Sequence, residues 1–475
     1  MSLNDDTRFY IDGAWSDRAD APRIAVANPA TEEVIGHIAA GSAADVDLAV
    51  AAARRAFESF SQTSVAERVA LLERVRDLLE ERAEEFAQAI TAEMGAAISF
   101  SRAGQCHFGI EHVRVAAEVL RDYPFEREVD GIYIRREAIG VVAAICPWNW
   151  PLYQITAKLA PAFAAGCTVV LKPSEMSPFS ALLFARVVHD AGFPAGVFNM
   201  VNGSGEVVGN AMSGHPDVDM VSFTGSTRAG VEVAKAAAPT VKRVVQELGG
   251  KSPNVFLPDA NFADAVPKGV LGAMRNVGQS CAAPTRMVVP RERLAEVESL
   301  AREAAEGIKV GDPNDESCFI GTLANRPQFE KVQALIRAGI EEGAKLVAGG
   351  PGLPEGVNHG FFARPTVFSE VTPEMRVAQE EIFGPVLVIQ PYEDEEDAIR
   401  IANATVYGLS SHVQSADQEA ARRVARRIRA GQVHINYPAW SGFAPFGGYR
   451  QSGNGREYGR FALEEFLETK AILGY

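Results

Sequence analysis

The chain has 475 residues, of which 47% are hydrophobic and 23% are charged, an ordinary balance for a globular protein of two or three domains. Its formal net charge is −15, and its densest basic cluster, residues 422–429, alternates with apolar residues as on the solvated face of a helix. This acidic balance argues against a nucleic acid or an anionic membrane as a partner, because no basic patch is available to bind phosphate groups.

Cysteine and histidine usage gives no support to a disulfide framework or a metal site. The cysteines are odd in number, widely spaced and without a Cys-x-x-Cys pair: Cys106, Cys146, Cys167, Cys281 and Cys318. The eight histidines include no His-x-x-x-His pair. We therefore expect reduced thiols, a cytoplasmic location and no metal.

Two segments bear on targeting. Residues 1–6 are polar and acidic and do not resemble a secretory signal. Residues 138–157 carry no charge and are long enough to span a bilayer. Because Pro147, Asn149, Pro151 and Gln154 interrupt this stretch, we expect a buried strand that runs into a functional loop, and no membrane partner.

In chain order, the first regular pattern is helical. Residues 43–95 are typical of two helices, and Ser64 with Glu67 forms a capping box at the start of the second. An apolar stripe at helical spacing follows it: Val69, Leu72, Val75, Leu79 and Phe86.

After Gly140 short apolar runs alternate with helical patterns, which indicates a doubly wound α/β domain. The expected strands are residues 141–145, 168–171, 197–201, 218–223 and 244–245, and the expected crossover helices are 178–191, 205–213 and 226–238. A second α/β pattern starts at Pro253. Its expected helices are near 262–277, 291–306, 325–342 and 416–429, and its strands near 286–289, 345–348, 386–389 and 432–436. Residues 470–475 predict a short strand that docks elsewhere.

Two segments, 34 positions apart, carry the parts of covalent thiol chemistry: Glu247 in Glu-Leu-Gly-Gly-Lys, and Cys281 in Gly-Gln-Ser-Cys. A cysteine can attack an electrophile, and a carboxylate can later activate water to release the product. The alternative for Cys281 is an ordinary buried thiol. A glycine turn before it and two alanines after it leave space around the thiol, which favours the reactive interpretation.

Residues 223–227, Phe-Thr-Gly-Ser-Thr, follow a strand and open an alanine-rich helix. Gly225 would let a phosphate approach the backbone, and the helix start at Ser226 offers free N–H groups. An ordinary glycine turn capped by Ser226 remains an equal alternative. A second glycine run, residues 203–209, resembles a dinucleotide fingerprint with its spacing one residue too long, so a plain turn is favoured there.

Two further loops follow strand ends, where nucleotides and reacting groups bind in α/β sheets. Lys172 and Glu175 could hold ribose hydroxyls, and Glu175 would repel a 2′-phosphate. Taken alone, however, this tetrapeptide favours the alternative, a solvated Lys–Glu pair at a turn. In the stiff run Pro-Trp-Asn-Trp-Pro at 147–151, the Asn149 amide could stabilise an oxyanion. The alternative is a packed aromatic core segment in which the Asn149 side chain only forms hydrogen bonds with nearby backbone groups.

Together these segments resemble the NAD(P)-dependent aldehyde dehydrogenase superfamily, of the hydrolytic, non-acylating type. The resemblance rests on the loops at 147–149, 172–175, 223–226, 247–251 and 278–281, and further on 381–386, 445–448 and 452–457, and covers essentially the whole chain. It implies two doubly wound α/β domains and a small oligomerisation arm. The implied cofactor domain is 1–119 with 140–249, the catalytic domain 250–451, and the arm 120–139 with 452–475.

By the same resemblance, Cys281 is the nucleophile, Glu247 the general base, and Asn149 with the backbone N–H of Cys281 the oxyanion hole. Lys158 and Glu457 match positions of a proton path from the base. The reaction implied is oxidation of an aldehyde to an acid through a thioester on Cys281.

The resemblance also implies NAD as cofactor, with NADP possible, and a set of residues that hold it. Lys172 and Glu175 would hold the adenosine ribose, and Glu175 favours NAD. Gly225 and Ser226 would approach the pyrophosphate, and Glu381 with Phe383 would hold the nicotinamide ribose. Gly205 would line the adenine side. The remaining cofactor contacts are Trp148 and Leu248.

The implied substrate wall is aromatic and carries no fixed cation, so we expect an uncharged, apolar or aromatic aldehyde over a semialdehyde acid. Its residues are Trp150, Tyr153, Gln154, Trp440 and Phe446, with Ser280 and Ala282 beside the nucleophile. The arm and the terminal strand imply a homodimer or homotetramer.

Three rival interpretations remain. A coenzyme A-acylating dehydrogenase resembles this chain but usually lacks the equivalent of Glu247. A non-catalytic binding or structural protein on the same scaffold would be expected to lose Cys281 or the ribose contacts. A thiol hydrolase would need a histidine motif near Cys281, and none is recognisable.

Overall fold

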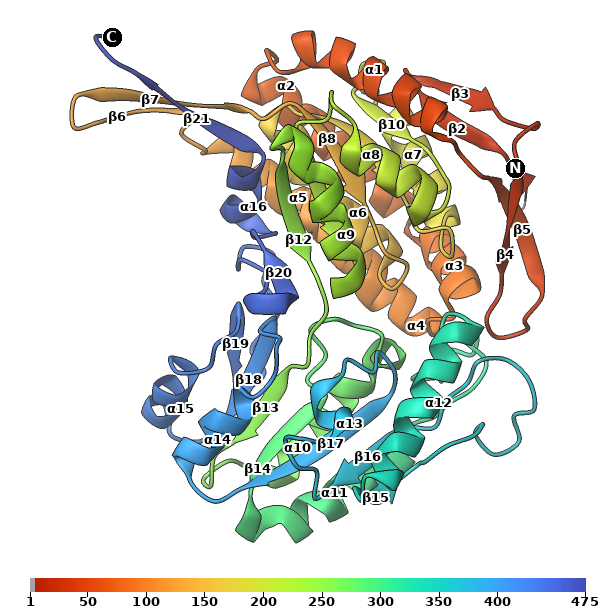
Figure 1. Ribbon diagram of the computed structural model, residues 1–475, viewed down its shortest axis with the longest axis vertical. Coiled ribbons are helices and arrows are strands. Elements are labelled where there is room, and N and C mark those ends of the chain that lie inside the picture. Colours follow the sequence, from red (N-terminus) through yellow and green to blue (C-terminus); the bar gives the residue numbers. More distant parts are fainter. Residues whose placement is uncertain (1–4) are drawn as a thin grey trace.

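The computed structural model describes residues 5–475. Two sheets, each covered by helices, lie one above the other, and the chain passes between them from β12 to β13 (Figure 1). The prediction about the N-terminus concerns residues 1–6, of which residues 1–4 lie outside the described residues.

The first sheet has the order β20-β12-β11-β8-β9-β10-β2-β3, and its five central strands are parallel. The fully buried, apolar runs of β8, β9 and β11 are typical of strands covered on both faces. Its strands are β2 (Arg8–Ile11), β3 (Ala14–Asp17), β8 (Val141–Ile145), β9 (Thr168–Lys172), β10 (Phe198–Met200), β11 (Met220–Thr224), β12 (Arg243–Glu247) and β20 (Gly453–Asn454).

Helices connect and cover these strands. The region 43–95 forms three helices and not the two predicted, because the helical pattern restarts directly after Arg82: α1 (Ala43–Phe60), α2 (Val65–Glu81) and α3 (Ala83–Met94). The predicted capping box of Ser64 and Glu67 is confirmed. The other helices of this half are α4 (Ile98–Phe100), the π-helical turn η1 (Ser101–Cys106), α5 (His107–Arg121), α6 (Pro151–Ala165), α7 (Phe179–Asp190), the π-helical turn η2 (Gly205–Gly209), α8 (Asn210–Gly214), α9 (Thr227–Ala237) and the 3-10 turn η3 (Ala238–Thr240).

The second sheet has the order β15-β16-β17-β14-β13-β18-β19 and is parallel except at β15. Its strands are β13 (Pro253–Phe256), β14 (Arg286–Pro290), β15 (Lys345–Ala348), β16 (Thr366–Ser369), β17 (Val386–Tyr392), β18 (Ser410–Gln414) and β19 (Gln432–Ile435). Sequence patterns missed β13, β16 and β18; β18 reads as polar Ser-Ser-His-Val-Gln, although four of its five residues are buried.

The helices of the second half are α10 (Phe262–Met274), the 3-10 turns η4 (Arg275–Gly278) and η5 (Arg291–Arg293), α11 (Leu294–Glu306), α12 (Arg326–Glu341), α13 (Arg376–Gln379), α14 (Glu395–Ala402), α15 (Gln418–Ala425), the 3-10 turn η6 (Arg450–Ser452) and α16 (Gly459–Glu465). Both halves repeat one topology, although the sequence shows no internal repeat. The order β17-β14-β13-β18-β19 of the second sheet matches the order β10-β9-β8-β11-β12 of the first.

Two small sheets lie outside these layers. β6 (Glu126–Val129), β7 (Ile132–Ala138) and β21 (Leu467–Ile472) form an antiparallel arm that projects from the body, with the C-terminus at its end (Figure 1). The predicted terminal strand therefore docks on β7 of its own chain. β1 (Asp5–Asp6), β4 (Arg23–Ala27) and β5 (Val34–Ala39) form the other sheet near the N-terminus.

The uncharged stretch 138–157 folds as expected, with β8 running into a loop and then into α6. Among residues 5–475 we find no helix with the length and apolar character that a membrane crossing requires.

Candidate active site

The sequence-predicted residues of the first half gather at one edge of the first sheet. Asn149 follows β8, Lys172 ends β9, Gly225 follows β11 and Glu247 ends β12. Because these strands are parallel, their carboxyl ends lie at the same edge, and the strand order reverses between β8 and β11. Ligands of open α/β sheets bind at this position.

Lys172 and Glu175 are joined to each other and to the glycine run at 203. The Lys172 ammonium donates to the backbone oxygens of Pro173 (2.7 Å) and Gly203 (2.9 Å) and to the Glu175 carboxylate (3.1 Å). Burial lowers the pKa of Lys172, and Glu175 opposes that shift. The pair is therefore a built part of a loop and not the solvated pair that was the alternative.

A cavity of about 520 Å³ opens beside this pair. Its lining includes Glu175, Gly205, Phe223 and Arg228. A Cβ at Gly205 would meet no atom within 4 Å, so the space beside this glycine is open. The glycine run at 203–209 therefore forms one wall of a ligand-sized cavity, which the favoured interpretation as a plain turn did not predict.

The loop from β11 to α9 keeps both of its predicted interpretations. Ser226 caps α9 by accepting a hydrogen bond from the N–H of Ala229 at 3.2 Å, as an ordinary helix start does. A Cβ at Gly225 would lie 2.5 Å from the Phe223 ring, and one at Gly230 would lie 2.7 Å from Leu248. The loop and helix thus lie close against the sheet and leave the α9 N-terminus at the cavity side.

A second group, from both halves, lies along the chain crossing. Leu248 is buried, and the next glycine faces Glu381, whose carboxylate accepts the N–H of Gly250 at 2.9 Å. Burial raises the pKa of Glu381. Phe383 has a left-handed backbone (φ 60°) and meets Trp148 edge to face, with ring centroids 5.4 Å apart. These residues lie beside the cysteine loop, because a Cβ at Gly250 would overlap the backbone oxygen of Cys281.

Cys281 lies on a strained loop that follows α10. Asn276 (φ 55°), Val277 (φ 58°) and Gly278 (φ 69°) are all left-handed, a conformation that is rare for a β-branched residue such as valine. A side chain at Gly278 would overlap the carbonyl oxygen of Gly384. The loop carries Cys281, which is partly exposed while the other four cysteines are buried.

Asn149 is tied to this loop from the other half of the molecule. Its side-chain Nδ2 donates to the backbone oxygen of Gln279 at 2.9 Å, and Asn149 is 3% exposed. Gln105 and Asn276 donate to the backbone oxygen of Asn149 at 3.0 and 2.9 Å. Sequence analysis missed these two buried amides; the only signal for Asn276 was that asparagine tolerates positive φ.

Glu247 is fully enclosed and unusual in its bonding. It is 1% exposed, and neither carboxylate oxygen has a hydrogen-bond partner among residues 5–475. Close by, Lys158 donates to Glu457 and to the Thr224 hydroxyl, both at 2.6 Å. The two predicted proton-path residues therefore form a buried ion pair, with Thr224 as a third member that sequence analysis missed.

The charges of this region explain the pKa shifts. Burial, with the Glu457 carboxylate, raises the pKa of Glu247 well above its usual value. Burial is the largest single influence on Lys158 and lowers its pKa, but Glu457, Cys146 and Glu247 together outweigh burial and keep that pKa raised. Burial, together with Glu381, Glu247 and Glu457, raises the pKa of the Cys281 thiol. Cys281 is thus a thiol at rest, and its proton needs an acceptor.

The predicted substrate residues form an aromatic wall beside Cys281. The Trp150 indole donates to Ser280 Oγ at 2.9 Å, and Tyr153, Cys281 and Ala282 pack against a buried cluster that contains Phe446. Gln154 is buried on α6, and its Oε1 has no partner among residues 5–475. Trp440 lies at the exposed end of the wall. The wall also includes Phe108, His112 and Tyr458, which sequence analysis missed.

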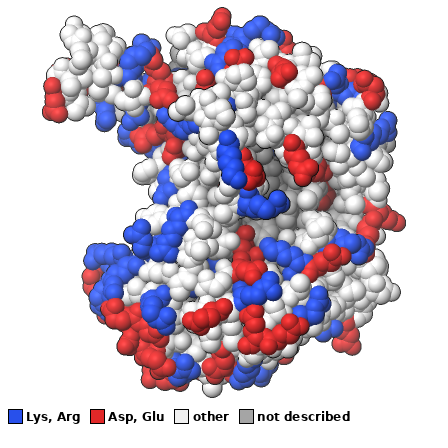
Figure 2. Space-filling view, in the orientation of Figure 1, with Lys and Arg blue, Asp and Glu red and all other residues white. Residues whose placement is uncertain are grey.

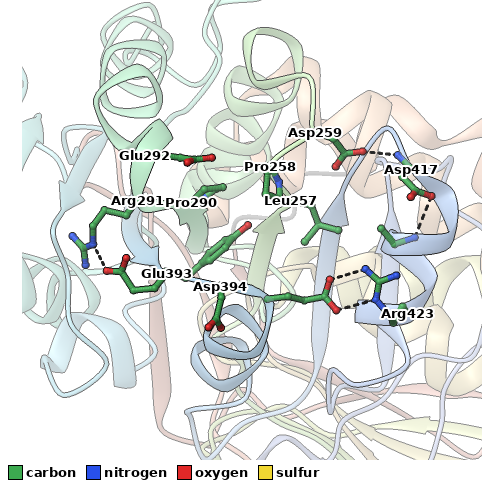
Figure 3. A pocket seen from close by; sticks show the side chains of 13 residues that line it. Leu257, Pro258, Asp259, Pro290, Arg291, Glu292, Glu393, Asp394, Asp417 and Arg423 are labelled. Atoms are coloured by element: carbon green, nitrogen blue, oxygen red, sulfur yellow. Dashed lines mark hydrogen bonds and ion pairs between the residues drawn. The ribbon is translucent and has the colours of Figure 1, made fainter.

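A cavity of about 670 Å³ lies at the carboxyl ends of β13, β14, β17 and β18, the equivalent edge of the second sheet (Figure 3). Its arginines are already paired, Arg291 with Glu393 and Arg423 with Glu395. Asp394 and Asp417 cap α14 and α15 with their own carboxylates. These anions occupy the helix N-termini where a phosphate would bind, so this edge does not suit a nucleotide.

Basic and acidic side chains are intermixed on the face shown in Figure 2, which is hollowed between the two halves. Among residues 5–475 no cluster of His, Cys, Asp and Glu is arranged to hold a metal.

The chain matches the profile described as the Aldehyde dehydrogenase family over residues 15–472. It is 54% identical, over all of its length and 99% of the relative, to a 3-succinoylsemialdehyde-pyridine dehydrogenase from a Pseudomonas species. Among solved structures it is similar to a cysteine-to-alanine mutant of aldehyde dehydrogenase C from Pseudomonas syringae with NAD+ and octanal (64% identity, TM-score 0.98, 99% and 97% of the chains). It is also similar to an NAD+ complex of a Bacillus cereus aldehyde dehydrogenase (37% identity, TM-score 0.95, 99% and 97%).

The strained cysteine loop makes a testable prediction. Gly278→Ala should lower the stability by more than about 2 kcal/mol and reduce activity at least tenfold, because the new methyl group has no room and φ is left-handed. Thermal unfolding and turnover would measure both. In Gly272→Ala, inside α10 with open space, stability should stay the same or rise. If Gly278→Ala and Gly272→Ala lowered stability and activity equally, the explanation by backbone strain in the cysteine loop would be wrong.

Proposed function

The chain belongs to the aldehyde dehydrogenase family, and we propose that its site oxidises an aldehyde with NAD to the carboxylic acid, with water releasing the product. One observation carries the hydrolytic part of this proposal. Glu247 is buried near Cys281 with both oxygens unpartnered, so its carboxylate is free to bind and deprotonate a water molecule. The family relation supports the oxidation itself.

We assign covalent attack to Cys281. Its thiol must lose a proton first, and the Glu247 carboxylate, whose pKa is raised, is a suitable acceptor. The sulfur then bonds to the aldehyde carbon and forms a thiohemiacetal with a negatively charged oxygen. One N–H of the Asn149 amide is anchored on Gln279, which leaves the second N–H to donate to that oxygen beside the backbone N–H of Cys281.

We assign release of the acid to Glu247. It takes a proton from water, and the resulting hydroxide attacks the thioester carbon, while the Cys281 sulfur leaves as thiolate. The pair Lys158–Glu457, with Thr224, gives the proton a buried chain of polar groups away from Glu247. Lys158 also lowers the pKa of Glu247 and so partly offsets burial.

We assign NAD to the cavity of about 520 Å³, which supports this assignment by its ligand-sized volume, and to the crossing beside it. Lys172 and Glu175 would hold the adenosine ribose, Gly205 leaves room on the adenine side, and Gly225 with Ser226 offers the α9 N-terminus to the pyrophosphate. Glu381, with Phe383, Trp148 and Leu248 around it, would hold the nicotinamide end. When bound, NAD accepts the hydride that converts the thiohemiacetal to the thioester.

The site argues against the rival functions. An acylating enzyme would pass the acyl group to coenzyme A and would have no use for the free carboxylate of Glu247. A silent scaffold would have no use for a strained loop that presents Cys281 to Asn149, because such strain is costly unless it serves a function.

We propose an apolar or aromatic aldehyde as substrate. Aromatic rings lie next to Cys281, from Trp150, Tyr153, Phe446 and Trp440. The Ser280 hydroxyl already accepts a hydrogen bond from the Trp150 indole. The Pseudomonas syringae complex contains octanal, an apolar aldehyde, and the Pseudomonas relative is named for a semialdehyde that carries an aromatic pyridine ring; both support this class.

We also propose a cytoplasmic homo-oligomer. The arm of β6, β7 and β21 projects from the body and exposes Val129, Leu473 and Tyr475, which a second subunit would cover. We propose the domain division 1–119 with 140–249, 250–451, and 120–139 with 452–475. Within the last segment, β20 pairs with β12 of the first sheet, while β21 pairs with the arm.

One prediction of the proposed function concerns its two chemical steps, thioester formation and thioester hydrolysis. Glu247→Gln should give one rapid equivalent of NADH per site, after which turnover falls by about 10² or more, because thioester forms but water is not activated. Stopped-flow absorbance would resolve the burst. Cys281→Ala should abolish both phases, whereas Cys106→Ala, at a buried thiol in the core, should keep them. Full steady turnover by Glu247→Gln would contradict the assignment.

The second prediction concerns cofactor choice. The native protein should use NAD at least about tenfold better than NADP in kcat/KM, because the Glu175 carboxylate repels a 2′-phosphate. Glu175→Gln should narrow this ratio mainly through the KM of NADP. Glu206→Gln, an exposed carboxylate on the same cavity, is the matched control. An unchanged ratio in Glu175→Gln would show that another group selects the cofactor.

The third prediction concerns substrate class. Octanal, hexanal and benzaldehyde should each exceed succinic semialdehyde in kcat/KM, because the wall offers ring surface and no cation to a carboxylate. NADH formation without coenzyme A is the measurement. A kcat/KM at least tenfold higher for succinic semialdehyde than for benzaldehyde and hexanal would refute the apolar class.

A further inference from the structure

A cavity of about 390 Å³ lies between the body of the protein and the base of the arm. The body contributes the loop between α1 and α2, the first turn of α2 and the end of α6, and the arm contributes β7. No residue that we assign to catalysis, substrate or NAD lines it. Its volume suits a small molecule, so the cavity is a candidate for a second ligand site.

Arg68, on the α2 side of this cavity, is a buried cation. It is 6% exposed, and its Nε has no hydrogen-bond partner among residues 5–475. The preceding Glu67 is exposed and bonds to the Ser64 cap, and no carboxylate of that part of the chain forms an ion pair with Arg68. Burial lowers the pKa of Arg68, but an arginine keeps its proton in proteins, so the charge remains.

The surroundings of Arg68 supply only partial negative charge. Its Cζ lies 5.3 Å from the centroid of the Phe125 ring, and a Cβ at Gly166 would lie 2.5 Å from its Nη1. Gly166 caps the C-terminus of α6, whose last carbonyl groups carry about half a negative charge. A ring face and a helix end are weaker partners than a carboxylate. Because buried charges in proteins are usually paired, we expect an anion beside Arg68.

The carboxylates of the cavity do not supply this anion, because they are paired on the arm. Arg135 lies 3.8 Å from Glu126 and 3.3 Å from Glu137, and Lys470 lies 2.5 Å from Glu137. Arg136 also lines the cavity and forms no ion pair within residues 5–475. The cavity therefore has more positive charge than its own carboxylates neutralise.

We propose that this cavity binds a small organic anion, whose carboxylate or phosphate group pairs with Arg68 and Arg136. A guanidinium group suits either oxyanion, because it can donate two parallel N–H bonds to it. The apolar part of the ligand contacts the rings of Phe57 and Phe125, which line the same cavity. Since Arg68 belongs to α2 and Arg136 to β7, the bound anion bridges the body and the arm. This site does not depend on the proposed oxidation.

The test is calorimetric titration of the full chain with phenyl phosphate and with benzoate at constant ionic strength. For at least one of them, the native protein should bind one anion per chain that Arg68→Met binds at least about tenfold more weakly, the worth of a hydrogen bond to a charged group. The tighter anion identifies the group that the site prefers. Methionine keeps a flexible side chain against the Phe125 ring without the charge. Benzyl alcohol, an uncharged probe of similar shape, should show no binding that depends on Arg68.

Two further variants locate the site. Arg136→Gln should weaken the same binding, whereas Arg127→Gln, at an exposed arginine of the arm outside the cavity, should leave it unchanged. Equal binding of both anions to the native protein and to Arg68→Met would overturn the site. If those two proteins bound equally and Arg68→Met also changed the sedimentation coefficient, a carboxylate of a second chain would be the partner of Arg68 instead.

Thermal unfolding separates a ligand site from a structural cation. In buffer without either anion, Arg68→Met should melt no lower than the native protein, because the substitution removes a buried charge that lacks a full partner. The tighter anion should raise the melting temperature of the native protein and not that of Arg68→Met. A lower melting temperature of Arg68→Met, with no effect of either anion on the native protein, would make Arg68 a structural residue and refute the proposal.

Discussion

The site depends on the hydrogen bonds of the Asn276 amide. This side chain donates to the backbone oxygens of Asn149 and Gln279, and so joins the loop after β8 to the loop that carries Cys281. The two loops belong to different sheets, and the contact is buried, where an unmade hydrogen bond is costly. The same bonds hold the left-handed backbone at Asn276 and Val277 in place. Cys281 and Asn149, the proposed nucleophile and oxyanion donor, are thereby positioned by one network that sequence motifs do not include.

Charge placement decides which sheet edge can bind a nucleotide. Both sheets have the same order of parallel strands, and both have a cavity at the carboxyl ends. In the first sheet the α9 N-terminus is capped by the neutral Ser226. In the second sheet Asp394 and Asp417 cap α14 and α15 with carboxylates, which repel a phosphate. One repeated topology therefore supports a cofactor site in one half and a catalytic loop, at the opposite strand ends, in the other.

Near Cys281 the protein gathers more negative charge than its pairs neutralise. Glu247, Glu381 and Glu457 all raise the pKa of the thiol, and only Glu457 has a buried cation as its direct partner. A raised pKa makes the Glu247 carboxylate a better proton acceptor for the resting thiol than an ordinary glutamate would be. The burial that raises the pKa values of Cys281 and Glu247 also keeps water away from the aromatic wall beside them.

The sequence by itself determined the α/β class and the strand ends that carry Asn149, Lys172, Gly225 and Glu247, and it singled out Cys281 as the proposed nucleophile among five cysteines. These features are local, because apolar period, capping residues and glycine turns act over a few residues. Tertiary structure alone decided that Gln105 and Asn276 anchor Asn149, that Thr224 joins the Lys158–Glu457 pair, and that His112 enters the aromatic wall. Each of these depends on burial and on partners more than 40 residues away. A polar residue has the same local pattern whether it is solvated or enclosed, so only the packed structure distinguishes the two.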